Sequence, residues 1–260
     1  MILLFLKKTL YDYWDNFIKL ILCNIGYIIL MFLNYGAYLL INSFSIDIPV
    51  IKEILISIIV CISFFIYSGA VNGFVRDIAY YNDPGIKDFL KHLKNSFTMS
   101  ILFGILFYIV ILVTFFAFIF YNDLNFEFSI AAQIIILCTM FFIINASQYF
   151  YPIYYAGETN FLKIIKRTFI FLIDNPLFSI SLLLFSTVLI LLSLVTFTLI
   201  PGFATIPLLF HIGFKLRMYK YKYLEENPSE DNKIPWTKLL TDENKKVGTR
   251  TLRDLLFPWK

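Results

Sequence analysis

The side chains that could bind a ligand in this 260-residue chain are a few polar groups set inside long apolar runs. A polar side chain that faces hydrocarbon is unfavourable, so such groups are expected to face the interior of a helical bundle. There they either line a cavity for a ligand or hydrogen-bond one helix to another. The candidates for a polar cavity are Asn72, Arg76, Asn145, Gln148 and His211.

Arg76 and His211 would draw an anionic or hydroxyl-rich ligand into such a cavity, because both can donate hydrogen bonds and carry positive charge. Arg76 also suits a simpler role, in which its guanidinium reaches out to the membrane interface. The sequence leaves both roles open.

Catalytic signatures are missing from the sequence. It contains no HExxH, no Walker A loop and no GxSxG. No Asp or Glu lies in the middle of an apolar run, where proton- and sodium-coupled carriers place carboxylates. The two histidines, His92 and His211, lack metal-ligand partners, and Cys23, Cys61 and Cys138 lie apart within apolar runs. We therefore expect no metal, no cofactor and no enzymatic activity.

Composition places the chain in a membrane: 59% of its residues are hydrophobic and 15% are charged, whereas soluble domains carry about 25% charged residues. A helical span needs about 20 apolar residues, and the sequence has enough such runs for an all-α, polytopic helical bundle. The predicted spans cover residues 18–42, 54–76, 98–121, 128–151, 177–199 and 203–218. Residues 1–218 are thus a six-span transmembrane domain, and residues 219–260 a polar cytoplasmic tail.

An amphipathic segment precedes each pair of spans, at 2–17, 85–97 and 161–173. Such helices lie in the membrane plane, with their lysines at the level of anionic headgroups. The chain is either three copies of one unit, an interfacial helix followed by a hairpin, or an ordinary six-span protein with basic inner loops. The candidate contacts for lipid or for a protein partner are Lys87, Lys91, Lys94, Lys163, Lys166 and Arg167.

The placement of Lys and Arg predicts the topology. They gather in the loops on one side of the predicted spans, and the loops on the other side contain only Lys52. By the positive-inside rule the basic side is cytoplasmic, so both termini are cytoplasmic. Cations beside apolar runs indicate topology rather than nucleic-acid binding.

Gly69 and Gly73 are spaced four residues apart in the second run. This spacing lets two helix backbones approach closely in a bilayer. Packing within one bundle and a seam between two copies both fit it, so the sequence leaves the oligomeric state open.

Three stretches resemble the YesL-like family of bacterial integral membrane proteins, a group of unknown function. They are VRDIAYYNDPGIKDFLKHLKNSFTMSILFG (75–104), YPIYYAGETNFLKIIKRTFIFLIDNPLFSISLLL (151–184) and PGFATIPLLFHIGFKLRMY (201–219). The resemblance covers residues 70–220 and leaves out the first span and the tail after Tyr223. It implies a helical bundle in the bacterial cytoplasmic membrane, often associated with carbohydrate uptake, with no catalytic residues to transfer.

The leading hypothesis is a non-enzymatic membrane component. It would be accessory to solute uptake, of carbohydrate for example, or to envelope processes, through a partner bound on its cytoplasmic surface. The alternative is a permease-type subunit driven by a separate ATPase. The segment AGETNFLKIIKRTFIFLIDNP lacks the E-A-A…G…L-P pattern of sugar-importer permeases, which counts against this alternative. A lipid-modifying enzyme ranks third, because the catalytic groups are missing.

Overall fold

The computed structural model describes residues 2–43, 49–123, 128–227 and 234–248, and within these it contains helices and no strands. In chain order, the helices are α1 (Ile2–Asp15), α2 (Phe17–Ser43), α3 (Pro49–Ala79), α4 (Ile86–Asp123), α5 (Ser129–Ser147), α6 (Phe150–Tyr155), α7 (Phe161–Asp174), α8 (Pro176–Val195), α9 (Thr205–Glu226), α10 (Trp236–Leu239) and α11 (Thr241–Val247). The predicted all-α class is confirmed.

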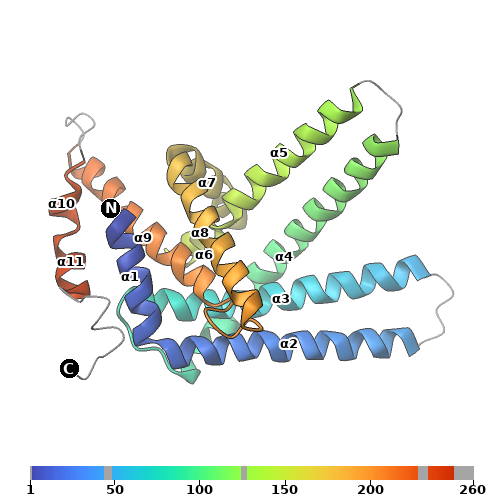
Figure 1. The fold of residues 1–260 in the computed structure, drawn as a ribbon, viewed down its shortest axis with the longest axis horizontal. Helices are drawn as coiled ribbons and strands as arrows, with labels where there is room; N and C mark the ends of the chain where they lie inside the picture. Colours follow the sequence, from blue (N-terminus) through green and yellow to red (C-terminus); the bar gives the residue numbers. More distant parts are fainter. Residues whose placement is uncertain (1, 44–48, 124–127, 228–233, 249–260) are drawn as a thin grey trace.

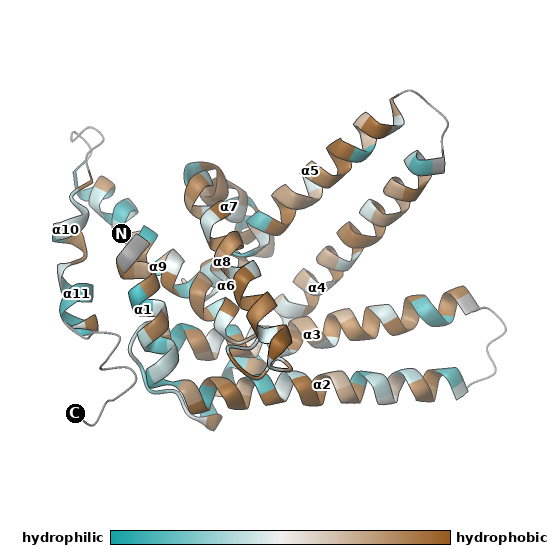
Figure 2. Ribbon diagram, in the orientation of Figure 1, coloured by the Kyte–Doolittle hydropathy of each residue, from teal (hydrophilic) through white to brown (hydrophobic). Residues whose placement is uncertain are grey.

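Two helical hairpins project from a packed group of the other helices (Figure 1). One hairpin is α2 and α3, and the other is α4 and α5. We call their projecting parts the arms, and we call the remaining helices, with the adjoining ends of α2 to α5, the head. Hydrophobic residues dominate α5 and α8, whereas hydrophilic residues gather on α11 and on the end of α9 (Figure 2).

Five segments of the described chain are long and apolar enough to cross a membrane: 17–43, 50–79, 86–122, 129–155 and 176–195. They correspond to the first five predicted spans. The sixth predicted span, 203–218, falls in α9 and is not among them. The reason lies in the charges of α9, because Lys215, Arg217, Lys220 and Lys222 interrupt the second half of this helix.

Helix α4 joins two elements that the sequence separates. The amphipathic segment 85–97 and the third predicted span form one uninterrupted helix of 38 residues. At 1.5 Å per residue this is about 57 Å, far more than the roughly 30 Å of hydrocarbon. Its first turns therefore belong to the head and its later turns to an arm. Helices α1 and α7 lie where segments 2–17 and 161–173 predict them.

Helix α8, which corresponds to the fifth predicted span, begins at Pro176, one residue before the predicted start, and has Pro in its first turn. The Asn175 side chain does not cap this helix. Its amide instead donates to the backbone carbonyl of Phe171 and to the Tyr221 hydroxyl. The second contact places the later part of α9 beside the start of α8, so both ends of the α8–α9 hairpin lie in the head.

The turn of that hairpin is held by one side chain of α2. Asn24 Nδ2 donates to the carbonyls of Leu199 and Pro201 at 2.9 and 3.0 Å, and Asn24 Oδ1 accepts from the Ala204 amide at 2.8 Å. The backbone approaches this amide at Gly202, where φ is +76° and a Cβ would collide with Asn24. Asn24 thus satisfies three backbone groups of a non-helical segment, which a membrane interior requires.

Candidate functional site

Four of the predicted cavity residues form two hydrogen-bonded pairs in the head. His211 Nε2 lies 3.2 Å from Asn72 Oδ1, and because an amide oxygen only accepts, the ring nitrogen must donate. Gln148 Nε2 donates to Asn145 Oδ1 at 2.6 Å and to the Ser179 carbonyl at 3.2 Å. All four side chains are buried.

Asn72 and Gln148 line one cavity of about 260 Å³ at the junction of α3, α4, α6 and α9. The rest of its wall is mainly aromatic: Tyr27, Phe64, Phe65, Phe103, Phe107, Tyr151, Phe203 and Phe210. Asn145 and His211 are not part of the wall and lie behind Gln148 and Asn72 as their partners. Gln148 Oε1 has no hydrogen-bond donor within the described ranges.

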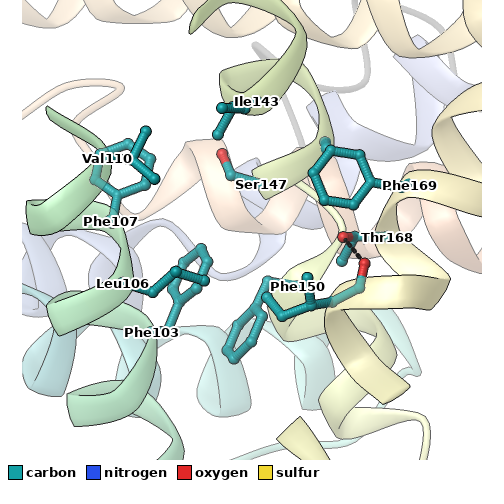
Figure 3. Close-up of a pocket in the computed structure, with 11 residues that line it drawn as sticks. Phe103, Leu106, Phe107, Val110, Ile143, Ser147, Phe150, Thr168 and Phe169 are labelled. Atoms are coloured by element: carbon teal, nitrogen blue, oxygen red, sulfur yellow. Dashed lines mark hydrogen bonds between the residues drawn. The ribbon is translucent and has the colours of Figure 1, made fainter. Parts of the chain in front are cut away.

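A second cavity of about 170 Å³ shares Phe103, Phe107 and Ser147 with the first. Figure 3 shows its wall, which comes from α4, α5, α6 and α7 and is almost wholly apolar. The Thr168 hydroxyl donates to the Ile165 carbonyl at 2.7 Å, so this polar group is already satisfied. The second cavity offers space for an apolar group rather than a polar contact.

Arg76 does not join the cavity. Its Nη1 lies 2.9 Å from Asp77 Oδ1, and its guanidinium carbon is 5.1 Å from the centre of the Tyr80 ring. The side chain is partly exposed. Arg76 thus lies near the end of α3, away from the cavity wall.

The chemistry available in the cavity is neutral hydrogen bonding among aromatic rings. Asn72, Gln148 and Ser68 can pair with hydroxyl or amide groups. No nucleophile there lies against a general base that could activate it. Across the described residues, no group of three or more His, Cys, Asp or Glu side chains is placed to hold a metal.

The structure reveals a histidine–carboxylate pair that sequence analysis missed. His92 Nε2 of α4 lies 2.7 Å from Asp77 Oδ2 of α3, and the Tyr155 ring packs edge-on to His92. The chain reverses between α3 and α4 and brings residues fifteen positions apart into contact. Asp83, Pro84 and Gly85 interrupt the helices at this reversal, but the spacing of Asp77 and His92 along the sequence does not indicate their contact.

A second feature that was missed is a buried group of four charges, which we call the ionic cluster: Lys8, Asp12, Lys215 and Glu243. Lys8 Nζ lies 2.7 Å from Asp12 Oδ2 and 3.8 Å from Glu243 Oε2. Lys215 Nζ lies 2.7 Å from Glu243 Oε1. Glu243 also accepts hydrogen bonds from the hydroxyls of Tyr81 and Tyr219.

Burial is nearly complete for these charges, with relative exposures of 0% for Lys8 and 2% for Glu243. Desolvation raises the pKa of the Asp12 carboxyl to about 6, although Lys8 opposes the shift. Burial alone would also raise the pKa of Glu243. The hydrogen bonds from Lys215, Tyr81 and Tyr219, with the charge of Lys215, outweigh it and lower the pKa of Glu243 below its usual value.

The predicted contact cations remain on the surface. We call them the basic surface: Lys87, Lys91, Lys94, Lys163, Lys166 and Arg167, all exposed on α4 and α7. The Tyr154 hydroxyl donates to the Asn95 carbonyl, which fixes α6 against the first turns of α4. Arg167 pairs with Glu158 at 3.1 Å, and the five lysines form no ion pair among the residues described.

Gly69 and Gly73 lie where α3 meets other helices of the same chain. A Cβ on Gly69 would collide with Ser96 and Ser100 of α4, and one on Gly73 with His92 and Tyr155. Tyr155 also donates to the Gly69 carbonyl at 2.7 Å. The two glycines thus allow the close approach that joins α3 to α4 and α6.

Comparisons with protein-family models, with curated proteins and with solved structures give no match. The class of this protein therefore rests on its own features, which are, in the described ranges, an all-helical fold and five apolar helices of membrane-spanning length. These features indicate a multi-pass integral membrane protein whose apolar helices contact lipid.

Proposed function

We propose that this chain is a non-enzymatic protein of the bacterial cytoplasmic membrane. It is accessory to solute uptake, for example of carbohydrate, or to envelope processes, and it acts through a protein partner on its cytoplasmic face. In this proposal both termini lie at the cytoplasmic side with the head apart from its α8–α9 hairpin, and the arms and that hairpin enter the bilayer. The resemblance to the YesL-like family is part of the same proposal.

The observation that carries the partner proposal is the contrast between two sets of lysines in the head. Lys8 and Lys215 are buried against carboxylates and hold the chain together. The lysines of the basic surface are exposed and have no carboxylate partner among the described residues. Exposed cations that stabilise nothing within the chain are available to lipid headgroups and to an acidic partner.

The six-span topology is also part of the proposal. Two contacts support placing these segments on one side of the membrane. Asn175 joins the start of α8 to Tyr221 of α9, and Glu243 joins α11 to α1 through Lys8. The α8–α9 hairpin, which supplies the fifth and sixth spans of this proposal, then leaves and returns to the same face. Positive charge on that face is what the positive-inside rule requires.

The test is purification from its native membrane in nanodiscs, with bound proteins identified and quantified. Reversing Lys163, Lys166 and Arg167 to Glu should remove the partner. The matched control reverses Lys222, Lys238 and Lys245, three exposed lysines of α9 to α11, and should leave partner recovery unchanged. Equal recovery with both triple variants would exclude the basic surface as the docking site. A stoichiometric ATPase among the bound proteins would support the permease alternative.

A further inference from the structure

The carboxylate of Glu243 sits in a site built from three separate parts of the chain, which we call the anion socket. Lys8 comes from α1, Tyr81 follows α3, and Lys215 and Tyr219 come from α9. Lys215 and Tyr219 contact Glu243 Oε1 at 2.7 and 2.8 Å, while Tyr81 and Lys8 face Oε2. Cationic and phenolic donors around two oxygens form a receptor for an oxyanion.

The charge balance shows that this socket requires an anion. Without Glu243 it would hold two lysines against the single carboxylate of Asp12, which is itself 2.7 Å from Lys8. The Lys215 ammonium also donates to the Ala79 carbonyl, and Lys246 lies 4.8 Å from the Tyr81 ring. These groups add no second negative charge, and a buried uncompensated cation is strongly unfavourable.

The segment that supplies the anion is short and contributes few buried side chains besides Glu243. Helix α11 has seven residues, and only Glu243 and Val247 in it are buried. Leu240 before it is buried as well, and Lys7 donates to the Gly248 carbonyl at 2.9 Å. A helix this short is unstable in isolation, and segments with few buried contacts open at low free energy.

Helix α1, which supplies Lys8 to the socket, has an outer face typical of helices at the depth of lipid headgroups. On α1, Leu6, Leu10 and Trp14 are exposed on the outside of the protein, while Lys8 and Asp12 point inward. An apolar face with Trp marks the boundary between headgroups and acyl chains. At that depth, the oxyanions outside the protein are the phosphates of the lipid.

We propose that the anion socket is a binding site for the phosphate of an anionic membrane lipid, and that Glu243 is the internal ligand that closes it while α11 is docked. The lipid phosphate and the tail carboxylate therefore compete for the same donors. This inference goes beyond the proposed partner surface and does not depend on it.

The test compares phosphatidylglycerol retained by variants reconstituted in nanodiscs of phosphatidylcholine with phosphatidylglycerol, counted by native mass spectrometry. Glu243→Gln should retain severalfold more phosphatidylglycerol than the wild type. Asp242→Asn removes the same charge from an exposed neighbour on α11 and should match the wild type. Adding Lys215→Gln to Glu243→Gln should abolish the gain. Equal retention by the Asp242 and Glu243 variants, or a gain that survives Lys215→Gln, would overturn the proposal.

Two further measurements test the competition between Glu243 and lipid, and whether the phosphate comes from lipid or from solution. In the wild type, amide hydrogen exchange of residues 236–248 should be faster in nanodiscs with phosphatidylglycerol than in phosphatidylcholine alone, and equal rates would contradict the competition. Inorganic phosphate added to Glu243→Gln in phosphatidylcholine should not raise its melting temperature, whereas phosphatidylglycerol should. Stabilisation by inorganic phosphate alone would assign the socket to a soluble anion and refute the lipid.

Discussion

The arms and the head of this protein are stabilised in different ways. In the arms, large apolar side chains such as Phe116, Phe120 and Leu137 are exposed, and few polar side chains bridge the helices. In the head, buried charges and amides connect segments that are far apart in the chain, as in Lys8 with Glu243 and Asn24 with the α8–α9 turn.

This difference reflects the surroundings of the two regions, which are lipid around the arms and other protein groups inside the head. An arm surrounded by lipid needs only internally paired backbone and apolar side chains, so many sequences satisfy it. The head packs polar groups away from water, and each of them needs a partner in one particular place. Substitutions in the head should therefore lower the free energy of unfolding much more than equivalent substitutions in the arms.

The largest effect is expected for Lys8→Met. It leaves Asp12 and Glu243 buried with Lys215 as the remaining cation of the ionic cluster. Breaking a buried ion pair by removing one partner costs about 3–5 kcal/mol, so unfolding in mixed micelles should show a loss of about 3 kcal/mol. Lys87→Met, on the exposed basic surface, should change the free energy of unfolding by less than about 0.5 kcal/mol. Similar losses for the two variants would remove the distinction between buried and exposed lysines.

A smaller loss is expected for Asn24→Leu, which keeps the size of the side chain and removes its three hydrogen bonds to the 196–204 turn. Unsatisfied buried backbone groups cost about 1–3 kcal/mol each, and partial rearrangement of the turn should leave a net loss of about 2 kcal/mol. The same change at Asn34, farther along α2, removes one contact with Ser63. It should cost less than half as much, and an equal cost would show that the turn does not depend on Asn24.

The pH dependence of stability should follow Asp12. Its pKa of about 6 in the folded protein lies above the ordinary value of 3.8, so the folded state binds this proton more tightly than the unfolded state. Stability should therefore fall by about 1 kcal/mol as pH rises from 5 to 7, and Asp12→Asn should abolish that change. Glu243 acts in the opposite direction, because its lowered pKa gives stability that is lost only below its ordinary value of 4.5. A stability that rises between pH 5 and 7 would contradict the burial of Asp12.

The smallest effect is expected for Ser57→Ala in the arms. Ser57 shares a hydrogen bond of 2.6 Å with Tyr108 on α4, and both side chains are in an exposed part of the fold. Interhelical hydrogen bonds in membranes contribute about 0.6 kcal/mol on average. Thermal unfolding should therefore barely change, and a loss as large as that of Lys8→Met would refute the contrast between arms and head.

The sequence predicts the long apolar helices well and the polar contacts of the head poorly. Hydropathy alone places α2 to α5 and α8, because apolar length is the whole requirement for a span. It does not predict that α4 continues from residue 86 through 123, since an amphipathic start and a membrane span can be one helix or two. Nor does it separate α9 from the spans, because its first half is apolar and Lys215, the first of the cations that follow, is buried in the head.

For the candidate site, the polar residues inside apolar runs identify Asn72 and Gln148 on the cavity wall and Asn145 and His211 behind it. The physical rule is that such groups must face the bundle interior. Glu243 could not be found in this way, because it lies in the polar segment 219–260, where an acidic side chain does not indicate a buried site. The tail boundary drawn at residue 218 crosses α9, and residues 249–260 lie outside the described part of the chain.

The most direct test of a cytoplasmic head with membrane-crossing arms is labelling of single cysteines in intact cells, with Cys23, Cys61 and Cys138 replaced. A membrane-impermeant maleimide should label Asn122→Cys at the far end of α4 from outside. It should reach Lys91→Cys and Lys222→Cys only after the membrane is opened. Labelling of position 91 or 222 from outside in intact cells would place the head on the extracellular side of the membrane and contradict a cytoplasmic head.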